Sequence, residues 1–212
     1  AVNRVWHYHF GRGIVRSPND FGFQGDSPTH PELLDWLASE FIAGGWRLKA
    51  LHKQIVLSST YRMSSQGNPK ALAADPENGL FWRFNLRRLS AEEFRDAMLA
   101  VTGALNPKMG GPGFYPEIPK DYFAGQSRPG AGWGHSSIEE QARRSVYIFV
   151  KRSLVTPILA SFDAADTDFS CPVRFSTTQP TQALSTQNGT RLNKQARALA
   201  ERVRKETGTA TE

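Results

Sequence analysis

The chain has very little cysteine and no long apolar run. Cys171 is its single cysteine among 212 residues, so no disulfide can form within the chain. For the same reason it has no Cys-x-x-Cys pair to attach haem or to bind a structural metal. The longest apolar run, residues 146–150, falls far short of the roughly 18 residues that a transmembrane helix requires. We therefore expect no membrane span and no haem on this chain, and a buried structural thiol at Cys171.

Recognised catalytic motifs are also missing. The sequence contains no Gly-x-Ser-x-Gly nucleophile elbow and no His-Glu-x-x-His zinc motif. Asp20-Phe21-Gly22 resembles a kinase magnesium motif, but no glycine-rich loop and no His-Arg-Asp segment accompany it, and it is interpreted as a turn. The motifs leave open whether the protein is an enzyme.

Positive charge is plentiful. Lys and Arg number 26 against 20 Asp and Glu, and the formal net charge is +6. Most of the cations are arginine, whose guanidinium suits bidentate contacts with carboxylate, phosphate or sulfate. An anionic partner is one interpretation, and pairing with the acids inside the fold is the favoured one.

Two amphipathic helices are predicted over residues 29–44 and 46–61. Thr29-His30-Pro31-Glu32 is a capping-box sequence, and apolar residues follow at helical spacing as far as Gly44-Gly45. A second apolar stripe begins directly after this short link. The two segments are expected to form an antiparallel helical hairpin packed through leucine and tryptophan.

The rest of the chain predicts further helices and a few extended residues. Ser90-Ala91-Glu92-Glu93 repeats the capping signature before another apolar stripe, and a basic terminal helix is expected after Asn188-Gly189. Residues 82–87 alternate apolar and polar side chains, and residues 145–151 are rich in β-branched and aromatic ones, which favours short strands. These two strands are predicted to pair.

The predicted fold class is mainly α. We expect a single irregular helical domain over residues 1–206, with the hairpin, the short two-stranded β element and a flexible tail at 207–212. Five Pro and seven Gly between residues 106 and 134 predict a long Gly/Pro-rich loop, placed at 106–142. Because the chain begins at Ala1 inside a helical pattern, without a signal-peptide pattern, we expect a piece of a longer polypeptide.

A series of spaced motifs covers the chain from its first residue to about residue 204. They include Asn3-Arg4-Val5-Trp6, His9-Phe10-Gly11-Arg12-Gly13, Pro28-Thr29-His30-Pro31-Glu32-Leu33-Leu34-Asp35-Trp36-Leu37-Ala38, Trp46-Arg47-Leu48-Lys49-Ala50-Leu51-His52, Arg87-Arg88-Leu89-Ser90-Ala91-Glu92 and Arg143-Arg144-Ser145-Val146-Tyr147. In these motifs the chain resembles a planctomycete-specific domain of unknown function, domain of unknown function fifteen fifty-three.

The resemblance implies context more than chemistry. Such domains occur in large exported proteins, beside a cytochrome-c-like module that would carry haem, and sometimes with carbohydrate-binding-like modules. It implies a periplasmic or extracellular location and other domains of a longer parent chain as partners. It transfers no activity, no catalytic residue and no cofactor to this chain.

The candidate catalytic cluster is His30, Asp35, His52 and Arg88. The predicted hairpin places His30 at the start of one helix and His52 on the other, where they would converge with Asp35 or Glu32 for general acid–base chemistry. The spacing matches no metal-ligand signature, so no metal is predicted, and a capping or core histidine is the commoner arrangement. His7 and His9 fall on different sides of their predicted helix, which argues against a shared metal.

A second set of candidates consists of cations that would bind an anion. They are Arg83, Arg87, Arg143, Arg144, Lys151 and Arg152. If the two predicted strands pair, these side chains form a cationic surface near Trp82 and Tyr147 for sulfated or uronic-acid glycans or for nucleic acid. An internal ion-pair network with the acidic helix that follows Ser90 is the favoured interpretation.

The leading functional hypothesis is a scaffold or interaction module beside a cytochrome-like or glycan-binding module. The alternative is an enzyme acting on anionic polysaccharide, with the His30 cluster as its site. Anionic glycan is a candidate partner, and nucleic acid is disfavoured.

Overall fold

The computed structural model describes most of the chain. The described ranges are 1–124, 128–174 and 176–208; residues 125–127 of the predicted loop and 209–212 of the predicted tail lie outside them. Within the described ranges the fold is mainly α-helical, as predicted, with 3₁₀ turns and isolated bridges in place of strands.

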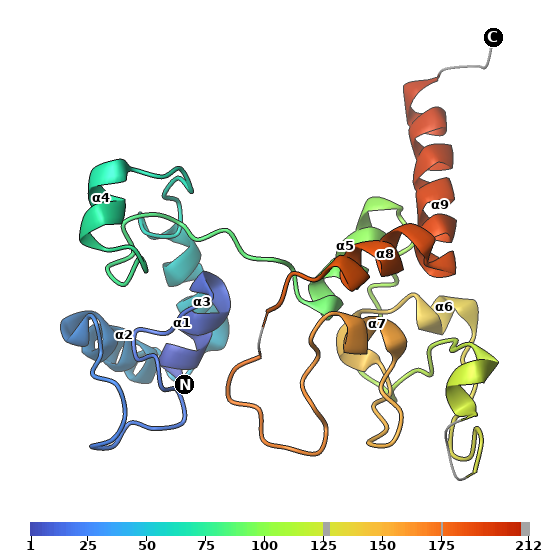
Figure 1. The fold of residues 1–212 in the computed structure, drawn as a ribbon, viewed down its shortest axis with the longest axis horizontal. Helices are drawn as coiled ribbons and strands as arrows, with labels where there is room; N and C mark the ends of the chain where they lie inside the picture. The colour runs from blue at the N-terminus through green and yellow to red at the C-terminus, as the bar shows by residue number, and fades with distance from the viewer. Residues whose placement is uncertain (125–127, 175, 209–212) are drawn as a thin grey trace. The chain divides into compact units, whose positions relative to one another are not determined.

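The chain divides into two compact units, residues 1–87 and residues 88–212 (Figure 1). Each unit has its own hydrophobic cluster. The predicted hairpin lies in unit 1, and the helix that follows Ser90 lies in unit 2. That residues 1–206 form one domain stays a prediction.

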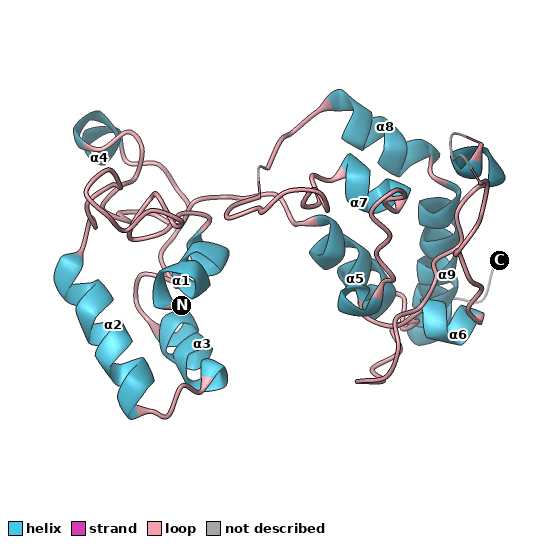
Figure 2. Ribbon diagram, turned by 90° about the horizontal axis from the view of Figure 1, so that it is seen from below, coloured by secondary structure: helices cyan, strands magenta, loops and turns pink. Residues whose placement is uncertain are grey.

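Unit 1 contains the predicted helical hairpin. Helices α2 (Pro31–Ala43) and α3 (Leu48–Leu57) lie side by side, and α1 (Val2–Phe10) contacts both (Figure 2). Both hairpin helices are shorter than predicted. A short helix, α4 (Pro69–Ala74), follows and is capped by the side chain of Asn68.

The start of α2 differs from the predicted capping box. His30 is the N-cap residue and makes no side-chain cap bond, while Pro31 lies in the first turn. Thr29 anchors the preceding loop instead, because its backbone N–H and its Oγ1 both donate to the carbonyl of Ile14, at 3.0 and 3.2 Å. The predicted capping role of Thr29 is therefore wrong.

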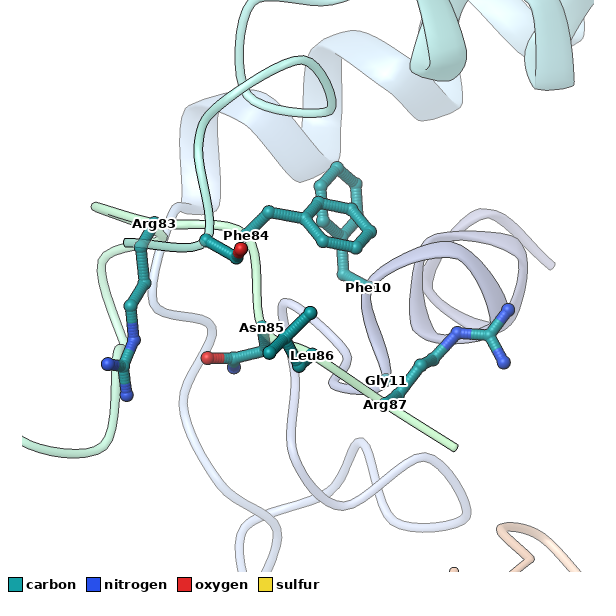
Figure 3. A pocket seen from close by; sticks show the side chains of 8 residues that line it. Phe10, Gly11, Arg83, Phe84, Asn85, Leu86 and Arg87 are labelled. Atoms are coloured by element: carbon teal, nitrogen blue, oxygen red, sulfur yellow. The ribbon is translucent and has the colours of Figure 1, made fainter. Parts of the chain in front are cut away.

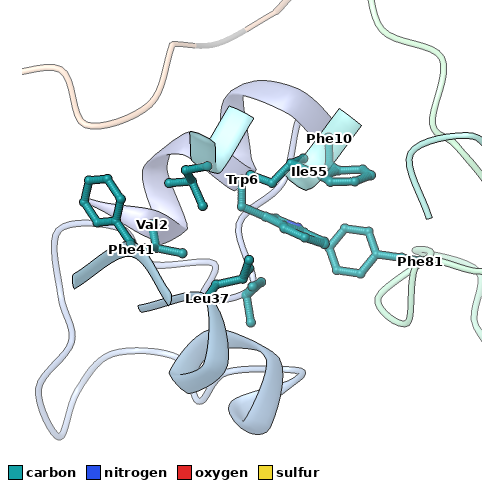
Figure 4. Close-up of a cluster of buried hydrophobic side chains, with 9 residues drawn as sticks. Val2, Trp6, Phe10, Leu37, Phe41, Ile55 and Phe81 are labelled. Atoms are coloured by element: carbon teal, nitrogen blue, oxygen red, sulfur yellow. The ribbon is translucent and has the colours of Figure 1, made fainter. Parts of the chain in front are cut away.

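Aromatic rings from α1 and from the loop after α4 complete the core of unit 1. Trp6 stacks on Phe10 with 4.3 Å between ring centroids, and Phe81 meets Trp6 edge-on at 5.4 Å. The buried members are Val2, Trp6, Phe10, Ile14, Leu37, Phe41, Leu51, Ile55 and Phe81 (Figure 4). The hairpin packs through leucine as predicted, but Trp36 and Trp46 are 52% and 63% exposed. The predicted tryptophan packing is wrong, because Trp6 supplies the indole of this core.

Unit 2 begins at the second predicted capping box. Before α5 (Ala91–Val101), Ser90 Oγ accepts a hydrogen bond from the backbone N–H of Glu93 at 3.3 Å, and Glu93 Oε2 accepts one from the N–H of Ser90 at 2.8 Å. The remaining helical elements are η1 (Lys120–Phe123), α6 (Ile138–Gln141), η2 (Ser145–Tyr147), α7 (Pro157–Ser161), α8 (Pro180–Asn188) and α9 (Thr190–Thr207). Helix α9 confirms the basic terminal helix, whereas α6, α7 and α8 were not predicted.

The predicted two-stranded β element is wrong. Residues 82–87 are irregular, and the start of the second segment forms the 3₁₀ turn η2. Ile148 of that segment forms an isolated parallel bridge with Phe114 instead of pairing with residues 82–87. The alternation at 82–87 has another origin: Phe84 packs on the core of unit 1 while its polar neighbours lie outside it.

A buried arginine orders the Gly/Pro-rich segment of unit 2. The side chain of Arg143 is 0% exposed, and its guanidinium lies 4.0 Å from the ring centroid of Tyr147. It donates to the carbonyl of Pro112 at 3.0 Å, to a carboxylate oxygen of Glu140 at 3.0 Å, and to the carbonyl of Gly110. Loop carbonyls that have no sheet partner are paired in this way.

A second buried arginine ties helix α5 to the residues before η2. Arg95 is 1% exposed and donates to the carbonyl of Arg143 at 2.9 Å, to Ser145 Oγ at 3.0 Å and to the carbonyl of Gln141. Burial lowers the pKa of Arg95 to about 10, with a smaller effect from the charge of Arg191. The guanidinium therefore stays charged at neutral pH, where its hydrogen bonds are strongest.

Replacing Arg143 by methionine tests this role. Arg143→Met leaves buried carbonyls without donors, so we expect it to lower the free energy of unfolding by about 3 kcal/mol. The matched control is Arg152→Met, whose exposed pair with Asp168 is expected to contribute about 1 kcal/mol at most. Urea denaturation followed by circular dichroism measures both; equal losses would contradict the structural role of Arg143.

Candidate functional site

Within the described part of unit 1, no hydrogen bond or ion pair joins His30, Asp35 and His52 of the predicted catalytic cluster. His30 Nδ1 lies 2.9 Å from Thr29 Oγ1, and the His30 ring packs on Phe81 with 5.6 Å between centroids. Asp35 is exposed on α2, and no partner for its carboxylate is found within the described ranges. His30 thus packs against its neighbours, and its role in catalysis stays a prediction.

Arg88, the fourth member of the predicted cluster, belongs to unit 2. Its Nη2 donates to Asp163 Oδ2 at 2.6 Å, and its Nε donates to the carbonyl of Thr177 at 2.9 Å. Asp163 also accepts a hydrogen bond from the backbone N–H of Thr177 at 2.8 Å. Contacts with Thr177 and Arg88 lower the pKa of Asp163 despite the opposing effect of burial. Arg88 therefore holds a loop in place.

His52 meets a histidine that the sequence did not pair with it. His52 Nδ1 on α3 lies 2.8 Å from His9 Nε2 on α1, and the ring of Tyr61 stands edge-on to His9 at 5.6 Å between centroids. Burial lowers the pKa of His9, and the charges of His52 and Arg87 lower it further. At least one ring must be neutral to accept the hydrogen bond, so the pair links α1 and α3 in its neutral or singly charged form.

This arrangement predicts lower stability in mild acid. The pKa values of His7 and His9 are lowered by folding, so the unfolded chain binds more protons once the pH falls through the ordinary histidine value of 6.5. Their contribution to stability is complete above that value and is lost below it. We expect a lower Tm at about pH 5.5 than at about pH 7.5, and a smaller difference in His9→Gln.

The control for this experiment is His135→Gln, which changes an exposed histidine of unit 2. Differential scanning calorimetry across the same pH range compares the three proteins. A pH dependence that is unchanged in His9→Gln would contradict the role of the pair.

The anion-binding candidates of unit 2 are engaged within the fold. Arg143 is the buried arginine described above, and Arg144 Nε lies 4.0 Å from Asp96 Oδ2 on α5. Lys151 donates to the carbonyl of Ala131, and Arg152 Nε donates to Asp168 Oδ1 at 2.8 Å. Each of these side chains thus contacts another residue of unit 2, but only Arg143 is buried, whereas Arg144 and Arg152 are exposed.

The two candidates in unit 1 border a hollow of about 460 Å³. Arg83 and Arg87 lie at opposite ends of its lining segment, and the Phe84 ring is directed toward Phe10 (Figure 3). The lining residues are Phe10, Gly11, Ser65, Arg83, Phe84, Asn85, Leu86 and Arg87. They combine cationic, amide, hydroxyl and apolar groups, which is typical of a site for a polar ligand.

Asn78 holds the segment that lines this hollow. It is 1% exposed and has a positive φ of 55°. Its Nδ2 donates to the carbonyl of Arg83 at 2.8 Å and to Asn85 Oδ1 at 3.1 Å, while the Arg83 N–H donates to Asn78 Oδ1 at 3.3 Å. The segment is therefore fixed by side-chain hydrogen bonds in the way that a neighbouring strand would fix it.

Asp75 stabilises the same loop from its other end. Its carboxylate accepts from the N–H groups of Gly79 and Leu80 at 2.9 and 2.8 Å, and these bonds lower its pKa. Its carbonyl accepts from Trp82 Nε1 at 2.9 Å. Sequence reasoning missed Asp75 and Asn78, although the Asn78-Gly79 pair is a turn signal that marks this loop.

Other kinds of site receive no support. Within the described ranges, no group of three or more His, Cys, Asp or Glu is placed to hold a metal ion. Cys171 is exposed, with its Sγ 3.3 Å from the carbonyl of Val173, so the expected burial of this thiol is wrong. None of the helices in the described part of the chain combines the length and apolar character needed to cross a bilayer.

Comparison with known proteins gives a family and no activity. A family model described as "Protein of unknown function (DUF1553)" matches residues 1–212. No curated protein and no solved structure matches the chain. The resemblance identified from the motifs is therefore confirmed at the level of the family.

Proposed function

We propose that this chain, which belongs to the family of proteins of unknown function (DUF1553), is a non-catalytic interaction module within a longer exported protein. Its neighbours would be a cytochrome-like or a glycan-binding module, with haem carried by the neighbour. The location would be periplasmic or extracellular. These features of context, and the restriction of the family to planctomycetes, stay predictions from the resemblance.

Three of the candidate catalytic side chains contact other residues of the fold, which supports this role. A general acid–base site needs groups that converge on substrate. Here His30 contacts Thr29, His52 contacts His9, and Arg88 contacts Asp163. No observation favours the alternative of an enzyme acting on anionic polysaccharide, which requires these groups to act together.

The observation that carries the proposal is the exposed Trp46 at the link between α2 and α3. It is 63% exposed and has a φ of 60°, a conformation that bulky residues rarely adopt. Its backbone N–H donates to the carbonyl of Phe41 at 2.9 Å, and its ring stands edge-on to Phe41 at 5.3 Å between centroids. The turn that ends α2 thus holds the indole against Phe41 with most of its surface exposed.

The surroundings of Trp46 match the anatomy of protein interfaces. Phe41 and Arg47 line a hollow of about 300 Å³ between the ends of α2 and α3. Trp36, Ile42 and Leu48 are each more than half exposed nearby in the sequence. Tryptophan and arginine dominate binding energy at interfaces, and exposed apolar groups mark contact surfaces. We assign this surface to another domain of the parent chain.

Hydroxyl-radical footprinting tests the assignment. The isolated chain and the longest natural polypeptide that contains it are oxidised side by side, and modification of individual side chains is measured by mass spectrometry. We expect oxidation of Trp46 to fall severalfold in the longer polypeptide, because the indole is covered there.

Tyr122 of unit 2, which is 51% exposed, is the internal control and should be oxidised equally in both proteins. Equal oxidation of Trp46 in both would contradict the proposal. Turnover of an anionic polysaccharide that is lost in His52→Ala, without a change in Tm, would establish the enzyme in its place.

A further inference from the structure

The hollow beside residues 83–87 has a chemical character that points to one ligand class. Two of its lining residues are arginine, and none is Asp or Glu. Asn85 and Ser65 add an amide and a hydroxyl, while Leu86, which is 85% exposed, adds an apolar surface. A ligand that fits this lining carries negative charge, hydroxyl groups and a C–H face.

Arg83 is held in place without losing its hydrogen-bonding capacity. Its guanidinium lies 4.7 Å from the ring centroid of Trp82, a stacking contact that leaves the N–H donors at its edge. No acceptor for these donors is found within the described ranges. Asn78 fixes the backbone on both sides of Arg83, so this cation is positioned before any ligand arrives.

Arg87 lines the other end of the hollow, and its guanidinium extends past Gly11, away from Arg83 (Figure 3). Its Cδ lies 3.8 Å from the place that a Cβ on Gly11 would occupy, so the side chain passes close to the end of α1. Its charge also lowers the pKa of His9 on that helix. Arg87 is therefore a charge at the edge of the hollow, beside α1.

We propose that this hollow binds an acidic saccharide, whose carboxylate or sulfate group pairs with Arg83. The inference rests on the proposed function and names a ligand class for the module. Arg83 offers its guanidinium donors to the anionic group, and Leu86 supplies a surface for the C–H face of a ring. The amide of Asn85 and the hydroxyl of Ser65 are partners for sugar hydroxyls.

The same lining disfavours single-stranded nucleic acid. Such strands bind where bases stack on exposed aromatic rings. The rings of this hollow lie inward: Phe10 is 5% exposed, and Phe84 packs on it at 6.0 Å between centroids. The phosphate backbone alone would find charge here but no stacking platform.

Isothermal titration calorimetry of the 212-residue chain tests the proposal. The probes are a galacturonate tetramer, a sulfated tetrasaccharide, a neutral galactose tetramer, inorganic sulfate and oligothymidylate, all at one salt concentration. We expect the acidic tetramers to bind and the neutral one to fail. Arg83→Gln should weaken binding about tenfold, because it removes a charge-assisted hydrogen bond.

Arg152→Gln is the matched control, since it removes the same charge from an exposed ion pair of unit 2 and should change Kd by about twofold at most. Arg83→Gln, which leaves the contacts of Arg87 intact, is the primary variant, and circular dichroism checks its fold. Equal weakening by both variants, tighter binding of oligothymidylate than of either acidic tetramer, or no binding of the acidic tetramers would overturn the inference. If Trp46 is protected in the longer polypeptide and any of these results is also found, the saccharide proposal is rejected while the proposed interaction module is retained.

Discussion

The structure depends on pairing the backbone groups of long irregular segments with buried side chains. Within the described ranges there is no sheet, so loops cannot satisfy their N–H and C=O groups in a ladder. In one loop the side chain of Asn3, which is 4% exposed, pairs with both backbone groups of Val15: it accepts from the N–H at 2.9 Å and donates to the carbonyl at 3.0 Å. In another loop Arg143 donates to the carbonyls of Gly110 and Pro112. Each unpaired buried group would cost about 1–3 kcal/mol, so these contacts decide where the loops lie.

The candidate site follows from the same constraint. Asn78 pairs with both backbone groups of Arg83, as Asn3 does with Val15, and thereby fixes the segment that lines the hollow. In unit 2 the arginines that the sequence offered for anion binding contact carbonyls and carboxylates of the fold. The proposed ligand site therefore contains Arg83. Its backbone is fixed by Asn78, and within the described ranges its guanidinium donates no hydrogen bond to the fold.

The sequence predicted α2, α3, α5 and α9 because their signals are local. Apolar spacing gave the hairpin, and the Ser90–Glu93 capping box located α5. The strands failed because only Phe84 of residues 82–87 packs on the core, while Leu86 is 85% exposed. The Phe84 N–H donates to the carbonyl of Ser64 at 3.1 Å, but no ladder of such bonds forms in the described part of the chain. The contact between His9 and His52 could not be predicted, since it depends on how α1 packs on α3. The burial of Arg143 likewise depends on carbonyls of a distant loop.

Amide hydrogen exchange measured by NMR tests most directly whether side chains order these loops. The N–H groups of Val15, Ser145 and Thr177 donate to side-chain oxygens at 2.9, 2.8 and 2.8 Å and lie outside the α-helices. We expect their protection to approach that of Leu51 and Ile55, the buried residues of α3. Exchange of the three amides at the rate of an unstructured peptide would contradict the account.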